Sequence, residues 1–345
     1  MNMHIRKTIT EIKRNSRVKV KNENGACFIC KQTRRIIDSH TVPKFVLKNI
    51  SLDGKLLTTK ILNYHPFMKE EVGKNEAGVF NLLCAECDST MFRDYENPDN
   101  YESEPSKKML AQIALKCALK GFYRSSRLVA NHDVIRERVG STEDFFMDSD
   151  MANRGQDKAD FKTLVAESSR AIDSKWEEYN VLYFEKLKHV VPFACQESIT
   201  LAVDLNDKII NDVYNLCGKI QFLFVCIFPL EQGSIALLFY KKHKKGVSNK
   251  YDIFRKQFNK LNVTEKQKLI SYIAFKESED VLCNPTKRSF LAKNKEVLQA
   301  ARDQGIISVE VINGRVNYDQ RTAEIVKIKS LQAYKNFPNL LADNP

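Results

Sequence analysis

The sequence predicts an α+β fold in which a zinc-stabilised N-terminal domain precedes a larger mixed α/β domain. Two CxxC pairs, Cys27 with Cys30 and Cys84 with Cys87, supply four thiolates, the ligand set of a closed structural zinc site. Later in the chain, runs rich in strand-forming residues are mixed with helical patterns. The length of 345 residues suits two or three domains. The alternative to a zinc site is four buried thiols that bind no metal. This alternative requires that two pairs with the same spacing arose by chance.

The charge balance favours a polyanionic partner. The chain has 55 Lys and Arg against 43 Asp and Glu, a net charge of +12. Together with a zinc site, this excess predicts binding to nucleic acid, DNA in particular. The alternative is a basic bias that affects only solubility.

Cysteine usage and hydropathy predict a cytoplasmic protein without a membrane anchor. The first residues lack the apolar segment of a signal peptide. The longest apolar run, residues 220–230, is shorter than the roughly 20 residues that span a bilayer. The cysteines outside the two pairs are scattered and odd in number, which argues against a disulfide framework. We expect them to be buried reduced thiols: Cys117, Cys195, Cys217, Cys226 and Cys283.

Residues 1–23 form a basic N-terminal arm. Ile5, Ile9 and Ile12 recur at roughly helical spacing, in a segment where Lys and Arg outnumber the acidic residues. The arm either contacts nucleic acid or serves as a solvated leader that tethers the zinc domain.

We expect residues 24–98 to form the zinc domain. A short extended run leads to His40. Pro43 restricts the residue before it to extended geometry, and we expect the strand to end there. His40 therefore lies where a strand enters a loop, a position that readily presents a side chain to a substrate. Residues 51–79 predict an irregular excursion, and residues 84–95 predict a helix.

The order of these motifs resembles a known family. A CxxC pair, a strand ending in Ser-His with a proline three residues on, and Asn-Leu-Leu-Cys-x-x-Cys-Asp entering a helix are similar to the zinc-bearing HNH endonucleases of the ββα-metal fold. The Ser-His-x-x-Pro form is the variant of bacterial HNH-like proteins. The resemblance covers residues 24–98. It implies metal-dependent hydrolysis of phosphodiester bonds in DNA, with a role in mobile elements or in defence against foreign DNA.

The resemblance assigns roles to particular residues. His40 matches the general base, Asn81 matches the asparagine that positions it, and Asp88 matches the helix residue that holds Mg²⁺ or Mn²⁺. The family usually has an acidic ligand directly before the histidine, where this chain has Ser39. Asp38, one residue earlier, is the second candidate ligand of the catalytic metal.

Other roles for these residues stay open. His40 could instead bond to backbone near the zinc site or act as a zinc ligand. Asp88 could simply be an acid in the first turn of a helix, where the helix dipole favours it. Asn63 or Asn75 could take the place of Asn81.

Residues 99–139 predict a helical connector, with Ser106 as N-cap and Gly121 as the end of its first helix. Residues 140–160 are acidic and predict a linker or loop. Three basic residues are candidates for contact with nucleic-acid phosphates: Lys44, Arg124 and Arg127.

Residues 161–305 predict an α+β domain that selects the substrate or regulates the reaction. Residues 161–187 are expected to be mainly helical, followed by strands that include a hairpin of residues 220–228 and 234–240. Three helices are expected afterwards: residues 251–261, 264–279 with Thr264 as N-cap, and 293–304. Residues 306–345 predict a hairpin at Asn313-Gly314 and a C-terminal tail.

Two functions remain at this point. One is an HNH-type endonuclease. The other is a zinc-stabilised module that binds nucleic acid or a protein partner, including a second copy of the chain, without cleavage.

Overall fold

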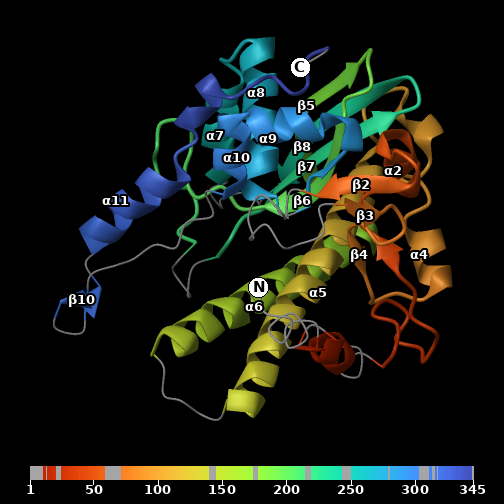
Figure 1. Cartoon of the computed structure of the whole chain (residues 1–345), viewed down its shortest axis with the longest axis vertical. Coiled ribbons are helices and arrows are strands. Elements are labelled where there is room, and N and C mark those ends of the chain that lie inside the picture. The colour runs from red at the N-terminus through yellow and green to blue at the C-terminus, as the bar shows by residue number, and fades with distance from the viewer. Residues whose placement is uncertain are drawn as a thin grey trace. The chain divides into compact units, whose positions relative to one another are not determined.

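The computed structural model describes residues 11–12, 14–20, 25–58, 71–139, 145–173, 178–213, 219–242, 250–278, 280–302, 311–312, 315–316 and 318–343 (Figure 1). The chain forms two compact units: unit 1 contains Met1–Thr41 and Gly78–Glu177, and unit 2 contains Val42–Ala77 and Glu178–Pro345. The expected class of mixed α and β structure is confirmed. The division differs from the expected domains, because residues 42–77 belong with unit 2 rather than with the zinc domain.

Unit 1 contains a small antiparallel pair followed by a helix. Strand β1 (Ser39–His40) pairs with β4 (Val79–Phe80), so that His40 lies opposite Val79. A bridge joins Ile36 to Cys84. Between this bridge and the β1–β4 pair, residues 37–38 on one side lie opposite residues 81–83 on the other. The extra residue makes a bulge in the 81–83 segment. Helix α4 (Ala85–Met91) follows and is shorter than predicted.

Two long helices, α5 (Lys107–Val139) and α6 (Phe145–Asp173), pack side by side in unit 1 (Figure 1). The predicted N-cap is confirmed, because the Ser106 hydroxyl accepts the Met109 N–H at 3.3 Å. Gly121 does not end the helix. A Cβ at this position would lie 2.2 Å from the Phe161 ring of α6, so glycine permits the close approach of the two helices.

The predicted acidic linker is wrong for residues 145–160, which belong to α6; residues 140–144 lie outside the described part of the chain. The helix has local support, since Gln156 donates to Asp160 at 3.0 Å. From residue 154 on, where burial is described, the first buried side chains of this helix are Phe161, Leu164 and Val165. The acidic composition of residues 140–160 thus gave no sign of the helix that runs through Phe145–Asp173.

Gly121→Ala should destabilise unit 1 by about 1–3 kcal/mol, because the added methyl group overlaps the Phe161 ring and the helices must separate. Gly155→Ala is the matched control in α6. A Cβ there meets nothing within 4 Å, so higher helix propensity should stabilise it by up to about 1 kcal/mol. Urea denaturation followed by circular dichroism measures both, and equal effects of the two substitutions would contradict the packing argument.

Unit 2 is built on a seven-stranded antiparallel sheet with the order β3-β2-β9-β6-β7-β8-β5. The predicted hairpin is confirmed and turns at residues 231–232. The helix predicted for residues 161–187 is wrong for residues 179–187, which form a strand; residues 174–177 lie outside the described part of the chain. The strands are β2 (Lys55–Thr58), β3 (Glu71–Gly73), β5 (Tyr179–Leu187), β6 (Phe193–Ile199), β7 (Leu223–Leu230), β8 (Gly233–Lys241) and β9 (Leu282–Cys283).

Alternate residues of the central strands face a core shared with the helices of unit 2. Val225 and Leu238 from the sheet meet Phe254 from α7 and Ile273 from α8 in one cluster. Helix α2 packs on β7 and β6, and Asn49 donates to the Pro229 carbonyl at 3.0 Å. The helices are α2 (Lys44–Ile50), α7 (Lys250–Phe258), α8 (Val263–Glu277), α9 (Arg288–Lys293), α10 (Lys295–Arg302) and α11 (Tyr318–Lys329), with short 3₁₀ segments at Pro285–Lys287 and Gln332–Asn336.

Local signals account for the remaining elements. The N-cap of α8 is Asn262 rather than Thr264, because Asn262 and Glu265 form a reciprocal capping box. The C-terminal hairpin is confirmed, as β10 (Val311–Ile312) pairs with β11 (Arg315–Val316).

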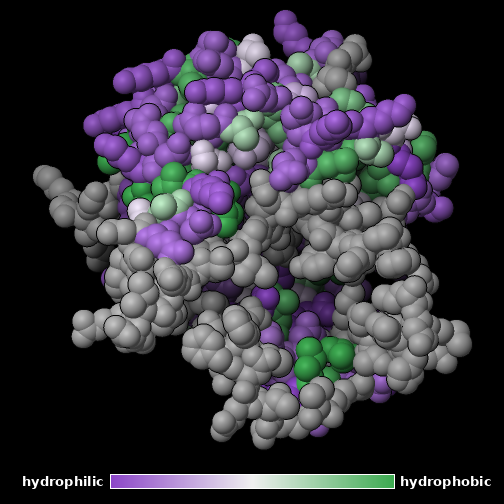
Figure 2. Space-filling view, turned by 60° about the vertical axis from the view of Figure 1, so that its left-hand side comes forward, coloured by the Kyte–Doolittle hydropathy of each residue, from purple (hydrophilic) through white to green (hydrophobic). Residues whose placement is uncertain are grey.

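Of the helices described, none has an apolar stretch long enough to cross a membrane. Figure 2 shows one face of the molecule, on which the described residues are mostly hydrophilic. The scattered cysteines of the described chain are buried, as expected; Cys217 lies outside it.

Candidate functional site

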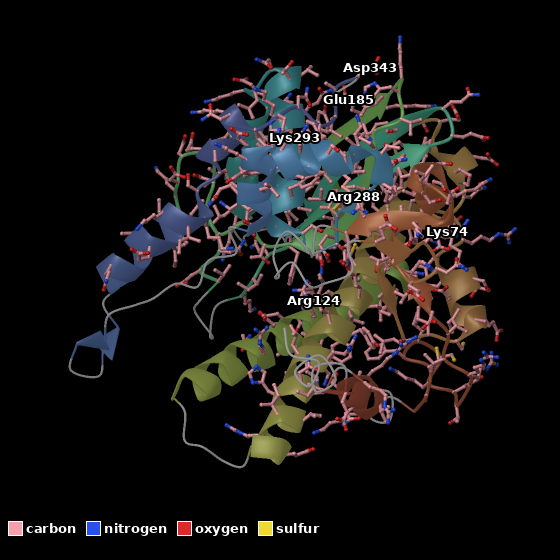
Figure 3. The ribbon with its side chains drawn as sticks, viewed as in Figure 1. Lys74, Arg124, Glu185, Arg288, Lys293 and Asp343 are labelled. Carbon is pink, nitrogen blue, oxygen red and sulfur yellow. The ribbon has the colours of Figure 1, made fainter. Side chains whose placement is uncertain are left out.

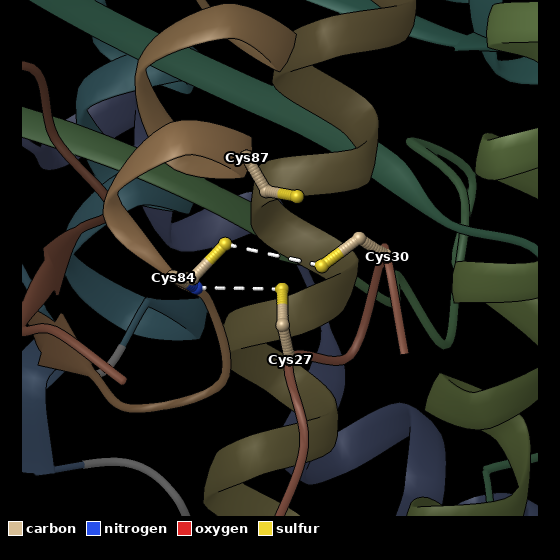
Figure 4. Close-up of side chains that lie close together, drawn as sticks. All are labelled: Cys27, Cys30, Cys84 and Cys87. Carbon is tan, nitrogen blue, oxygen red and sulfur yellow. Dashed lines mark hydrogen bonds between the residues drawn. The ribbon is translucent and has the colours of Figure 1, made fainter. Parts of the chain in front are cut away.

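The four cysteines of the CxxC pairs converge in unit 1 (Figure 4). Their sulfur atoms all lie within 4.8 Å of one another, and the Sγ atoms of Cys30 and Cys84 are 4.0 Å apart. A tetrahedral zinc ion with Zn–S bonds of about 2.3 Å needs sulfur–sulfur distances of about 3.8 Å. The four thiols could therefore hold a metal ion with small adjustments, which is consistent with structural zinc. The group contains no histidine, so nothing supports His40 as a zinc ligand.

The electrostatics of the four thiols also suit a cation. Burial opposes ionisation of the Cys27 thiol, but hydrogen bonds from backbone N–H groups outweigh burial and lower its pKa to about 6. One of these groups is the Cys84 N–H, which lies 3.4 Å from the Cys27 Sγ. Burial and the neighbouring thiols raise the pKa of Cys87 to about 12. Without a metal, one thiolate thus suppresses the ionisation of another. A zinc ion supplies the positive charge that four thiolates require.

His40 lies close to this centre in sequence and is held on β1. Its side chain is buried, with 7% exposed. The residue after it fixes the end of the strand, because Thr41 donates through its N–H and its hydroxyl to the Gly78 carbonyl, at 3.2 and 2.9 Å. The position of the backbone at His40 is therefore well determined.

Asp38 and Asn81 are brought together. The Asn81 amide donates to the Asp38 carboxylate and to the Ile37 carbonyl, and its oxygen accepts from Arg17 at 2.9 Å and from the Tyr123 hydroxyl at 3.1 Å. The Arg17 guanidinium also lies 3.1 Å from Asp38. Of the alternatives to Asn81, Asn75 belongs to unit 2 and Asn63 lies outside the described residues.

Asp88 is held by a buried lysine that the sequence analysis did not select. The Lys116 ammonium, on α5, lies 2.5 Å from the Asp88 carboxylate and 3.1 Å from that of Glu96. It also lies 4.1 Å from the centre of the Phe92 ring. The Lys116 side chain is fully buried. The only sequence signal for this contact is a lysine inside the apolar stripe of a helix.

Lys116 is the last member of a polar row on α5, which we define as Lys108, Gln112 and Lys116. These residues are four apart and so share one face of the helix. Lys108 and Gln112 donate to the Asp94 carboxylate at 2.9 and 2.7 Å, and Gln112 accepts the Tyr95 N–H at 3.0 Å. The polar row thus holds the turn that follows α4.

The Tyr95 hydroxyl connects this turn to the strand of His40. It lies 3.4 Å from the Thr41 carbonyl and 3.3 Å from Glu96, and its single proton can serve one of them at a time. Tyr95 is itself completely buried. Glu96, Tyr95 and the end of β1 therefore form one connected polar group.

The charge state of Glu96 should make stability depend on pH. Burial raises the pKa of the Glu96 carboxyl, and the Asp88 carboxylate adds to the effect, against the opposing pull of Lys116. The folded state therefore binds this proton more tightly than the unfolded state, whose pKa is near 4.5. The resulting stability is present below pH 4.5 and is lost as the pH rises through the folded pKa.

We compare the unfolding free energy of wild type with that of Glu96→Gln. The difference, wild type minus variant, should fall as the pH rises from 4.5 through the folded-state pKa of Glu96 and should then level off. Urea denaturation of both chains between pH 4 and pH 8 measures it. Titration of the zinc thiols occurs in both chains and cancels in the difference. A difference that rises with pH would contradict the assignment.

The candidate phosphate-binding residues lie in both units. Arg124 (Figure 3) and Arg127 are half-buried on α5. The Arg127 guanidinium lies 5.9 Å from the Tyr123 ring centre. Lys44 is exposed at the start of α2 in unit 2.

No family model, curated protein or solved structure matches the chain.

Proposed function

We propose that the chain is an HNH-type endonuclease that hydrolyses phosphodiester bonds in DNA with the help of a divalent metal ion. The observation that supports this most directly is the order of elements around the four cysteines. Two antiparallel strands, β1 and β4, precede helix α4, and His40 lies on the first strand. This is the order that the resemblance to zinc-bearing HNH endonucleases implies.

In this proposal His40 is the general base. Its neutral imidazole takes a proton from a water molecule, and the water oxygen forms a bond to phosphorus as the P–O bond opposite breaks. The leaving oxygen takes up a proton from solvent. The net charge of +12 favours binding of the polyanionic substrate, and unit 2 selects or regulates it.

Mg²⁺ or Mn²⁺ would offset charge on the leaving oxygen, with Asp38 and Asp88 as the ligands implied by the resemblance. The arrangement of these side chains does not fit that role. Asp38 is bonded to Arg17 and Asn81, and Asp88 is bonded to Lys116. The same observation favours the second candidate function, a zinc-stabilised module that binds nucleic acid without cleaving it.

His40→Ala should lower plasmid cleavage in Mg²⁺ or Mn²⁺ by about 10²–10⁴-fold, because a general base contributes that much. The matched control is His189→Ala in unit 2, where the ring bonds to the Leu341 carbonyl. This control should cleave like wild type. Zinc content, measured by elemental analysis, should be the same in all three chains.

Cleavage that survives His40→Ala would overturn the mechanism. DNA binding without any cleavage by wild type, in either metal, would favour the binding module.

A further inference from the structure

We propose that Lys116 is the cation partner of Asp88 and Glu96, in the place where the resemblance puts a divalent metal ion. Asp88 is then a positioning residue and not a metal ligand. The inference rests on the proposed function in one respect, because that function makes Asp88 a ligand of the catalytic metal. Whether a lysine ammonium or a metal ion lies beside Asp88 can be measured without a cleavage assay.

One ammonium group lies 2.5 Å from Asp88 and 3.1 Å from Glu96, so both carboxylates already share a cation. The cation comes from inside the protein, because the Lys116 side chain is fully buried while those of Asp88 and Glu96 are 18% and 31% exposed. Phe92 covers the ammonium with its ring. A lysine held in this way cannot move into solvent without breaking all three contacts.

A divalent ion bound to the Asp88 oxygen that Lys116 contacts would lie about 2.1 Å from that oxygen. Its separation from the ammonium could then not exceed about 4.6 Å, which is the sum of the two contacts. A double and a single positive charge at this distance repel strongly in a partly buried site. Lys116 and a divalent ion therefore compete for Asp88.

Lys116 has a positioning role instead. It is part of the polar row Lys108, Gln112 and Lys116, which holds the turn after α4. From that turn the Tyr95 hydroxyl reaches the Thr41 carbonyl, next to His40. Lys116 thus joins α5 to Asp88 of helix α4 and to Glu96, the neighbour of the tyrosine that reaches the strand of His40. Through Tyr95, this group of contacts links the helix to the strand, the positional task that a metal ion bridging them would perform.

One experiment compares Mn²⁺ binding by the zinc-loaded wild type and Asp88→Asn, using calorimetry or electron paramagnetic resonance. We expect affinities within about two-fold of each other. A loss of ten-fold or more in Asp88→Asn would overturn the inference. A wild type that binds no Mn²⁺ agrees with the inference and counts against the proposed metal-dependent cleavage, so the two proposals can fail separately.

A second experiment removes the internal cation. Lys116→Ala leaves the two carboxylates and space beside them, so millimolar Mn²⁺ should raise the melting temperature of this variant by several degrees. The double variant Asp88→Asn/Lys116→Ala should lose that response. An equal response in both variants, or none in a folded Lys116→Ala, would overturn the inference. If Lys116→Ala does not fold, the Asp88→Asn comparison still decides.

Discussion

Cys84→Ser is expected to abolish zinc binding and to unfold the part of unit 1 around β1, β4 and α4. Cys84 is the N-cap of α4, is bridged to Ile36, and donates its N–H to the Cys27 sulfur. Structural zinc contributes about 10–16 kcal/mol in small zinc domains, whereas a whole domain is stable by only about 5–15 kcal/mol. The short strands around the site cannot replace that contribution, since β1 and β4 have two residues each.

Zinc content by elemental analysis and helix content by circular dichroism measure this effect, and a strong chelator added to wild type should reproduce it. Cys226→Ala is the matched control, because Cys226 is an equally buried cysteine in the sheet of unit 2. The control should keep its zinc. A Cys84→Ser chain with unchanged zinc content would show that the four thiols do not hold the metal.

Lys116→Met is expected to destabilise the chain by about 3–5 kcal/mol. The substitution keeps most of the side-chain volume but leaves Asp88 and Glu96 close together without their shared cation. The triple variant Asp88→Asn/Lys116→Met/Glu96→Gln removes all three charges and should recover most of the loss.

Lys162→Met, at an exposed position of α6, is the control and should change stability by no more than about 0.5 kcal/mol. Denaturant titration of the four chains gives the comparison. A Lys116→Met chain as stable as this control would mean that the buried ion pairs are energetically irrelevant.

Prediction from the sequence succeeded where one local signal decides the structure. The spacing of the four cysteines predicted a group that converges in three dimensions, because CxxC turns can present their sulfurs only in a few ways. Two hairpins were predicted for the same reason, one from the apolar runs 220–228 and 234–240 joined by a short turn, and the other from the dipeptide Asn313-Gly314.

It failed where a distant segment decides the structure. Gly121 has the local character of a helix end, yet the Phe161 ring, forty residues away, gives it a different role. Residues 179–187 form a strand because β8 offers them a partner. The contact between Lys116 and Asp88 depends on how α5 meets α4, and no spacing along the chain encodes that meeting.

Because residues 42–77 belong to unit 2, they cannot complete their fold early in translation. The two halves of the four-cysteine group flank this segment, so a metal ion bound by the cysteines could close the intervening loop as soon as Cys87 has left the ribosome. Strand β2 must wait for β9, which pairs with it through Cys283 near the far end of the chain. A nascent chain would therefore carry an exposed strand edge for most of translation, a period in which such edges are prone to aggregate. A protein truncated after residue 98 would keep that edge permanently.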